Sequence, residues 1–259
     1  MKRLKTLLMG LLMIGSLSAQ FKDWWYVDKE LLGPVKQITT ISSRQDDPME
    51  VRKTIVRFDS VGRIAEREEF ETRESGKLEL STKYVYQYTK DNCCLRYQNA
   101  GNGNCVGMKK FCFNSEGQVI LAYDYHNGNL SFVDSLVYDS QGRLIEKYNS
   151  VLPGKMLFTY DSVGRIIEKR STMLGECTTY TYQPTGCYTI QKTDMYGKKH
   201  IEKYIVNSKG QLVKTQEGNF ESIISYYDPY GNWLKSEGTL RTLIGRYKST
   251  TKREIEYYK

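Results

Sequence analysis

Short stretches of alternating apolar and polar residues run along most of the chain, separated by a few turn-forming residues. The clearest is Val137–Lys147, with the sequence VYDSQGRLIEK, and a near-copy, TYDSVGRIIEK, follows at Thr159–Lys169. Short apolar stretches with imperfect alternation predict β-strands, and an interrupting Asp-Ser-x-Gly predicts a tight turn. The pattern therefore predicts a succession of β-hairpins.

Each turn is expected to be a three-residue loop closed by glycine. The Asp139 side chain can accept a hydrogen bond from the backbone two residues ahead, and Gly142 can adopt a positive φ that a Cβ would make costly. A type I turn followed by a left-handed glycine is a common hairpin loop. The cross-strand pairs that it predicts are Asp139 with Arg143, Tyr138 with Leu144, and Val137 with Ile145.

The pattern recurs in eight copies at intervals of 21–30 residues. Their turn residues are Gly62, Asn92, Gly117, Gly142, Gly164, Gly186, Gly210 and Gly231. A second series of turns is expected between them, at Gly76, Gly103, Gly128, Gly154, Gly175, Gly197, Gly218 and Gly238. A repeat of this size indicates stacked supersecondary units, and here each unit is a two-stranded hairpin.

The turn spacing leaves room for about 15–17 short strands in one sheet. With about 4.8 Å between neighbouring strands, a flat sheet of this size would approach 80 Å in width. Open sheets that wide normally curl, split or close. The predicted fold class is therefore all-β, a long antiparallel meander with a strongly twisted or curled sheet, and the pattern leaves open whether the sheet closes.

The motif Tyr-Asp-x-x-Gly-Arg-Leu at Tyr138–Leu144, with its variant at Tyr160–Ile166, resembles the YD repeats of RHS-type bacterial proteins. The likeness covers roughly Val51 to the C-terminus, and Leu32–Thr40 and the ending GNW…REIEYY are similar to short secreted bacterial proteins of the YD type. The resemblance implies a hairpin-repeat sheet and no catalytic residues. RHS proteins and teneurins build large hollow shells from many more repeats than this chain contains.

The first residues, Met1–Ala19, have the pattern of a secretory signal peptide. Three basic residues precede the apolar run Leu7–Leu17, and the small residue Ala19 suits cleavage before Gln20. An uncleaved anchor is the alternative, but the run is short for a bilayer span, which needs about 20 residues. Since no cysteine follows the run directly, the lipoprotein route is not expected, and the mature protein is expected to be exported to the periplasm, the outer-membrane surface or the medium.

The mature chain is expected to form one continuous domain, because no Pro-, Gly- or Ser-rich linker divides it. Residues 20–50 are predicted to be an N-terminal cap with a first strand at Val35–Ser42, and residues 51–259 the hairpin array. Repeat arrays need such caps to cover their ends. The aromatic stretch Phe21–Tyr26 belongs to the cap, or alternatively forms a platform for a sugar or a protein partner.

The charge of the chain argues against nucleic acid as a partner. The formal net charge is +8, and it falls to +5 when Lys2, Arg3 and Lys5 are removed with the signal peptide. The remaining charges alternate in sign along the strands, as on a solvated sheet face with opposite-charge pairs. A nucleic-acid surface would need a basic stripe with exposed aromatic residues. The expected partner is an envelope protein or a polysaccharide.

Six cysteines permit disulfides in an exported chain. They are Cys93, Cys94, Cys105, Cys112, Cys177 and Cys187. The hairpin around Gly101–Asn104 is expected to bring Cys93 or Cys94 towards Cys112 or Cys105, without choosing between them. Cys177 and Cys187 are expected near opposite ends of one strand, too far apart to bond. No CxxC pair is present and adjacent side chains point to opposite faces of a strand, so no cysteine metal site is expected.

The remaining candidate chemistry has structural explanations. His126 lies beside the Asn127-Gly128 turn and His200 at a predicted strand start, where exposure accounts for them. The aspartates of the motif fall at the turn position, where an Asx turn accounts for them; they are Asp59, Asp139, Asp161 and Asp228. The sequence contains no GxSxG, HExxH, P-loop or dinucleotide fingerprint. No cofactor, metal ion or catalytic residue is therefore expected.

The sequence favours a secreted, non-enzymatic repeat protein of the cell envelope that acts as a structural or interaction surface. A glycan-binding module using exposed Tyr and Trp is the alternative, with Trp24, Trp25 and Trp233 as the candidate binding residues. Trp233 replaces the usual aliphatic residue of the motif, so it is equally a candidate for a packed end cap. A hydrolase with two carboxylates in a concave pocket is a third hypothesis.

Overall fold

A single antiparallel sheet of 18 strands makes up the part of the chain that the computed structural model describes. That part comprises residues 31, 33–45, 47, 50–73, 75–242 and 245–258. The predicted signal peptide and Trp24 and Trp25 lie outside it. The strands are β1 (Val35–Arg44), β2 (Val51–Phe58), β3 (Ile64–Thr72), β4 (Leu78–Tyr88), β5 (Cys93–Ala100), β6 (Cys105–Phe113), β7 (Val119–His126), β8 (Asn129–Tyr138), β9 (Leu144–Asn149), β10 (Lys155–Tyr160), β11 (Ile166–Ser171), β12 (Cys177–Tyr182), β13 (Tyr188–Thr193), β14 (Lys199–Val206), β15 (Leu212–Glu217), β16 (Phe220–Tyr227), β17 (Trp233–Thr242) and β18 (Gly245–Tyr257).

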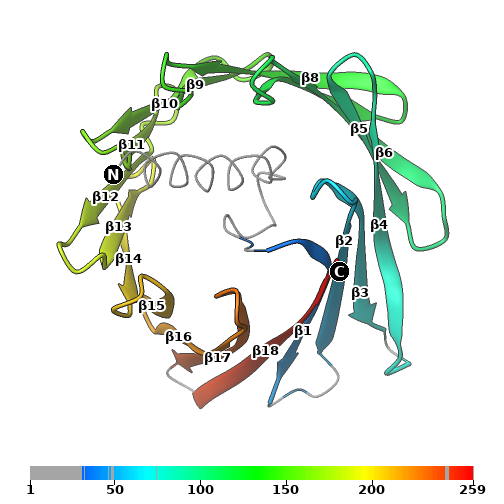
Figure 1. Cartoon of the computed structure of the whole chain (residues 1–259). Helices are drawn as coiled ribbons and strands as arrows, with labels where there is room; N and C mark the ends of the chain where they lie inside the picture. The colour runs from blue at the N-terminus through cyan, green and yellow to red at the C-terminus, as the bar shows by residue number, and fades with distance from the viewer. Residues whose placement is uncertain are drawn as a thin grey trace, which may run out of the picture.

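The sheet closes into a barrel (Figure 1). Each strand pairs antiparallel with the next one in the chain, and β18 pairs with β1. The all-β antiparallel meander is thus confirmed, and closure answers the question that the pattern left open. The predicted strand count was too low, because it was based on the two series of turns, and the connection between Arg44 and Val51, which contains no glycine, belongs to neither series.

The motif turns are three-residue loops whose last residue, Asn92 in one copy and glycine in the others, has a positive φ. In the first clear copy, the Asp139 backbone N–H donates to the Arg143 carbonyl at 2.9 Å, and Gly142 has a φ of 75°. One Asp139 carboxylate oxygen accepts the Gln141 and Arg143 backbone N–H groups, both at 2.9 Å. Hydrogen bonds from the Arg143 backbone and side chain lower the pKa of Asp139 below its ordinary value.

Two of the three cross-strand pairs predicted for this hairpin are present, and one is not. Arg143 Nε donates to Asp139 at 2.7 Å, and Tyr138 faces Leu144. Val137 lies opposite Glu146 rather than Ile145, because the register shifts between Val137 and Tyr138. Ile145 is the additional residue on the second strand at this point, which is a β-bulge.

The second series of turns follows the prediction except at its last member. Gly238 lies inside β17 and has no positive φ. A Cβ on Gly238 would stand 2.5 Å from Ser249 Oγ and 3.0 Å from the Phe220 ring. This glycine therefore serves close packing of β16, β17 and β18, and the hairpin turns after Thr242 instead.

Where the motif has a tyrosine, that tyrosine connects its hairpin to the one before it. Tyr160 on β10 donates its hydroxyl to the Leu144 carbonyl on β9 at 2.7 Å, beyond the last paired residues of these two strands. Burial and the nearby Tyr160 raise the pKa of Tyr138 to about 12, which keeps that hydroxyl protonated as a donor. The same bond joins Tyr88 to Ile64, Tyr138 to Val119, Tyr182 to Ile166 and Tyr227 to Leu212.

The arginine of the motif adds a second contact between hairpins. The Arg143 guanidinium, held by Asp139, lies 4.9 Å from the centre of the Tyr160 ring in the next repeat. Arg165 lies 4.3 Å from the Tyr182 ring in the same way. A cation over an aromatic face contributes about 0.5–1 kcal/mol at exposed sites. Asp, Arg and Tyr of the motif therefore form one connected unit that spans neighbouring hairpins.

The most buried cluster lies under the first half of the barrel wall. Its members come one each from the seven strands β2 to β8: Val56, Ile64, Tyr86, Cys94, Phe111, Val119 and Leu136. Motif aromatic residues pack against it, including Phe58, Tyr88, Phe113 and Tyr138. Side chains on the concave face of a curved sheet converge, so apolar side chains there are expected to pack against one another and become buried.

We expect Gly164→Ala to lower the free energy of unfolding by about 1 kcal/mol or more. Gly164 has a φ of 85°, and a Cβ there would meet no atom within 4 Å, so the whole cost comes from backbone strain. Urea unfolding followed by circular dichroism measures it. Ser162→Ala in the same turn is the control, and an equal loss in both variants would contradict the turn assignment.

We expect Tyr160→Phe to lower the free energy of unfolding by about 1 kcal/mol, because the Leu144 carbonyl loses its donor. Tyr148→Phe is the matched control, since Tyr148 is 41% exposed. Both variants keep the ring, so the difference in their unfolding midpoints isolates the hydroxyl. Indistinguishable midpoints would show that the bond between hairpins contributes no stability.

Candidate functional site

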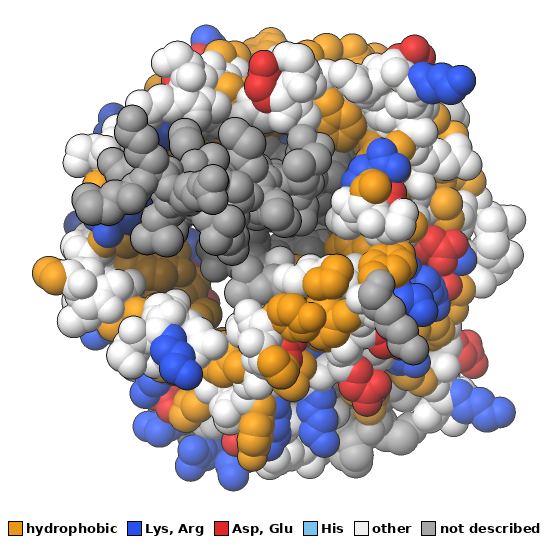
Figure 2. Space-filling model, viewed as in Figure 1, with side chains coloured by type: hydrophobic (Ala, Val, Ile, Leu, Met, Phe, Trp, Pro, Cys, Tyr) orange, Lys and Arg blue, Asp and Glu red, His pale blue; other side chains and the backbone are white. Residues whose placement is uncertain are grey.

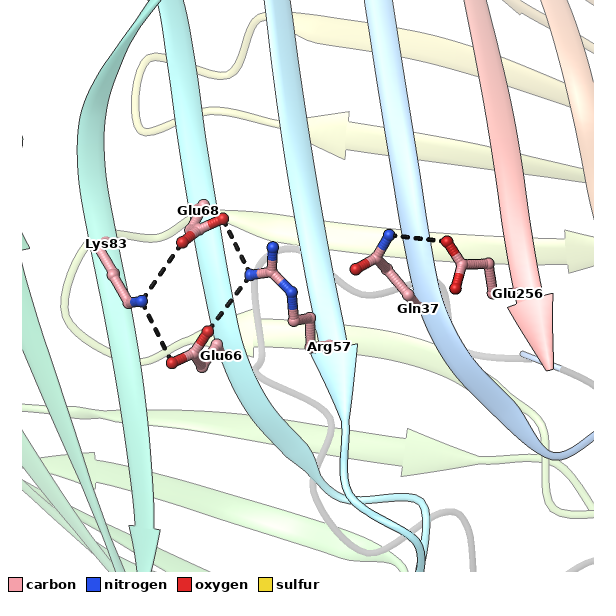
Figure 3. Close-up of polar contacts among 6 residues, drawn as sticks. All are labelled: Gln37, Arg57, Glu66, Glu68, Lys83 and Glu256. Carbon is pink, nitrogen blue, oxygen red and sulfur yellow. Dashed lines mark hydrogen bonds and ion pairs between the residues drawn. The ribbon is translucent and has the colours of Figure 1, made fainter. Parts of the chain in front are cut away.

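The barrel wall has an inner and an outer face, because successive side chains of a strand alternate. One set contains the buried cluster and also lines two clefts, so it faces the concave interior, where side chains converge. The other set includes Arg57, Glu66, Glu68 and Lys83, which Figure 3 shows with the far wall of the barrel behind their strands. The two faces differ in chemistry.

The larger cleft, with a volume of about 480 Å³, lies on the inner wall over β3 to β7. It has three cationic side chains and one carboxylate in its lining. The charged and polar side chains of the lining include Arg67, Tyr84, Arg96, Gln98, Lys109, Asp124 and His126. A site with this lining suits a polar ligand with an excess of negative charge.

Ion pairs and aromatic rings hold the cationic side chains of the cleft in place. Arg67 pairs with Glu69, and Lys109 pairs with Asp124, both at 2.5 Å. The Arg96 guanidinium lies 5.1 Å from the centre of the Tyr84 ring. Only 7% of the Arg67 surface is exposed, so its head group is fixed in the wall. The cleft is therefore largely preformed.

A smaller cleft, of about 50 Å³, adjoins the first over β5 to β9 and shares Arg96, Lys109 and Asp124 with it. Asp134 in its lining pairs with Lys147 at 2.9 Å and accepts a hydrogen bond from Asn149 at 2.8 Å. Each carboxylate lining the two clefts is thus held by a lysine.

A second polar group lies on the inner wall, on β11 to β14. Lys192 and the Tyr204 hydroxyl both contact the Glu202 carboxylate, and 7% of Glu202 is exposed. Burial and the charge of Lys192 lower the pKa of Lys169, whereas the hydrogen bond to Glu202 raises the pKa of Lys192. These contacts satisfy the buried carboxylate and account for the group as a structural network.

The outer wall carries opposite charges on neighbouring strands. Arg57 contacts Glu66 at 3.3 Å and Glu68 at 2.9 Å, and Lys83 contacts the same two carboxylates at 3.2 and 3.3 Å (Figure 3). Desolvation opposes ionisation of Glu68, but the hydrogen bonds from Arg57 and Lys83 outweigh it and lower the pKa of Glu68. Further pairs on this face join Glu146 with Lys155, Glu168 with Arg170, and Lys214 with Glu221. Figure 2 shows such charged side chains around the outer edge of the barrel.

Of the three tryptophans predicted to bind a glycan, the structure describes one. Trp233 opens β17 opposite Tyr227, and the Arg253 guanidinium lies 3.5 Å from the centre of its six- and five-membered ring system. Its surface is partly buried rather than open. The packed alternative therefore fits Trp233 better than a stacking platform does, because Arg253 already covers one ring face.

The sequence did not single out the residues of the larger cleft. Arg96 and Lys109 lie opposite each other on β5 and β6, and Asp124 lies opposite Lys109 on β7. His126 is exposed, as expected beside its turn, and also lines the cleft. The sequence contains these charged residues, but only the strand register shows that they fall at matching positions on neighbouring strands.

The cysteines separate into one pair and four individual thiols. Cys93 faces Cys112 across β5 and β6, whereas Cys94 points to the opposite face and is fully buried. Cys177 and Cys187 do not lie at the two ends of one strand: Cys177 begins β12 and Cys187 follows the turn after it. The described residues contain no cluster of three or more His, Cys, Asp or Glu side chains that could hold a metal ion.

Comparisons with known proteins inform the fold alone. No protein family matches the sequence, and no curated protein does. The structure is similar to that of a porin-like protein from Bacteroides uniformis, with a TM-score of 0.52 and 11% identity over 87% of this chain and 99% of that one. A partial likeness to TcdB2-TccC3, with a TM-score of 0.29 and 12% identity over 74% of this chain, covers 12% of that chain. The likeness to the porin-like protein shows a shared β-barrel fold and nothing further.

A helix long and apolar enough to cross a membrane is not found in the part of the chain that the structure describes.

Proposed function

We propose that this protein is an exported, non-enzymatic barrel of the cell envelope that binds an acidic saccharide chain in its larger inner-wall cleft. The observation that carries the proposal is the lining of that cleft, in which Arg67, Arg96 and Lys109 outnumber the one carboxylate, Asp124. Guanidinium groups bind carboxylates through two parallel hydrogen bonds. A uronic-acid chain offers such carboxylates together with many hydroxyl groups.

The neutral polar residues of the cleft support a hydroxylated ligand. Gln98 supplies an amide that both donates and accepts, and His126 lies at the exposed end of β7. Saccharide hydroxyls also both donate and accept, so they match this lining better than an apolar ligand would. Rigid placement of Arg67 in the wall lowers the conformational entropy lost on binding.

We base the proposed placement in the cell envelope on three observations of different kinds. The sequence predicts a cleaved signal peptide at Met1–Ala19. The fold is similar to that of a protein described as porin-like. The YD-type resemblance of the hairpins agrees with an exported repeat protein. The absence of turnover is proposed because the cleft carboxylates are committed to lysine ion pairs.

A membrane pore is the second candidate function, favoured by the shared fold with the porin-like protein. The outer wall argues against it. Glu68 and Lys83 lie in the middle of β3 and β4 and face outwards, and a basic residue facing lipid at the bilayer midplane costs about 2–4 kcal/mol. Strands β9 to β13 have six residues each, fewer than the roughly 9–11 that a membrane-spanning strand needs.

We expect Arg96→Gln to weaken binding of acidic oligosaccharides by roughly tenfold, as the loss of one charged hydrogen bond worth about 1.5 kcal/mol or more predicts. Isothermal titration of the mature protein with oligogalacturonate, and with a neutral glucan of equal length, measures the effect. Arg170→Gln on the outer wall is the matched control and should bind like the wild type.

Two outcomes would overturn this function. One is binding of the neutral glucan as tightly as the acidic chain, or no binding of either. The other is release of reducing ends from the acidic chain by wild-type protein, with loss of that release in Asp124→Asn at unchanged unfolding temperature.

We expect the mature protein to remain in the aqueous phase when it is partitioned with Triton X-114, because its outer wall carries paired charges at mid-strand. A porin of known membrane insertion, treated in parallel, should enter the detergent phase. Recovery of this protein in the detergent phase, or its flotation with lipid vesicles after a urea wash, would favour the pore instead.

A further inference from the structure

Two cysteines face each other on the outer wall of the barrel, in strands β5 and β6. Cys93 is the first residue of β5, and its register partner on β6 is Cys112. The two Sγ atoms lie 2.9 Å apart, and both cysteines are present as thiols. This separation is shorter than the sum of two sulfur van der Waals radii, so the side chains already point at each other.

The backbone at this position is compatible with a cross-link. The Phe113 N–H donates to the Asn92 carbonyl at 2.9 Å, one residue beyond Cys93 and Cys112 on each strand. That bond makes Cys93 and Cys112 a pair without hydrogen bonds between their own backbones, for which Cα atoms lie about 4.5 Å apart. Disulfides span Cα separations of about 4.4–6.8 Å. The pair can therefore be joined without moving either strand.

No other two cysteines lie opposite each other in the described strands. Cys94 follows Cys93 directly, so it points to the inner face, where it is fully buried. Cys105 begins β6, seven residues before Cys112, which places it about 23 Å away along the strand. Cys177 faces Thr193 across β12 and β13. The register thus singles out one of the pairings that six cysteines allow.

We propose that Cys93 and Cys112 form a disulfide in the exported protein, while the other four cysteines remain thiols. The oxidant is a small-molecule or protein disulfide of an oxidising compartment. The thiolate of one cysteine attacks it and releases one thiol, leaving a mixed disulfide. The second cysteine then attacks the mixed disulfide and releases the second thiol. The protein loses two protons and two electrons, and the oxidant takes them up to become two thiols.

The disulfide would tie together the two strands that carry most of the cleft cations. Arg96 and Lys109 face each other within the loop that Cys93 and Cys112 enclose. Burial, and then the hydrogen bond and charge of Cys93, raise the pKa of Cys112 to about 11. Since thiolates are the attacking species, exchange at Cys112 is slow in the folded protein at neutral pH, and the bond forms most readily while the chain folds.

The experiment maps thiols in the full chain after refolding with oxidised and reduced glutathione. Free thiols are alkylated under denaturing conditions, and the protein is digested and analysed by mass spectrometry. We expect two fewer alkylated cysteines than in the fully reduced protein, and a linked peptide pair containing Cys93 and Cys112. Cys105→Ser should keep the linked pair, whereas Cys93→Ser should lose it and leave Cys112 alkylated.

A second measurement needs no variant. The wild-type protein should unfold at a higher temperature when refolded with glutathione than when kept with a reductant, because the cross-link restricts the unfolded chain. Full alkylation of all six cysteines after oxidative refolding, or a dominant link between any other two cysteines, would overturn the proposal. These measurements involve no saccharide, so their result does not depend on whether the proposed ligand binds.

Discussion

Backbone pairing between β18 and β1 is the contact on which the rest of the structure depends. Nine residue pairs join these strands, from Val35 with Tyr257 to Arg44 with Ser249. Without them, the sheet would end in two unpaired edges, which invite association with other chains. The last described residue reinforces the seam: Tyr258 donates its hydroxyl to the Phe58 carbonyl on β2 at 2.7 Å. Here the chain end supplies the tyrosine contact that motif tyrosines supply elsewhere.

Closure divides the side chains into two populations with different consequences. Those on the inner wall converge, so a single face holds the aromatic motif residues, the buried cluster and both clefts. Those on the outer wall diverge into solvent and form paired charges such as Arg57 with Glu68. The same barrel can therefore place charge pairs on its outer wall and an apolar cluster on its inner wall. The backbone pairing determines that a barrel forms, and the alternating residues of each strand determine which side chains each wall presents.

The cleft illustrates why the candidate site could not be found by motif. Arg67, Arg96 and Lys109 come from three strands and lie up to 42 positions apart in the chain. None belongs to the repeat motif. What unites them is strand register, which depends on bulges such as those between Glu69 and Phe70 and between Gln98 and Asn99. One added residue reverses which side chains face inwards beyond it, so a small local feature decides the composition of the inner wall.

The sequence by itself determined the local structure, because turn geometry depends on neighbouring residues. Asp139, Arg143 and Gly142 specify their loop without any distant contact, and the all-β meander follows from repetition of that loop. The tertiary structure decided everything that requires two strands to be aligned. It closed the sheet, placed Val137 opposite Glu146, covered Trp233 with Arg253, and chose Cys112 as the partner of Cys93. Register and closure are set by backbone pairing between strands, which no single stretch of sequence encodes.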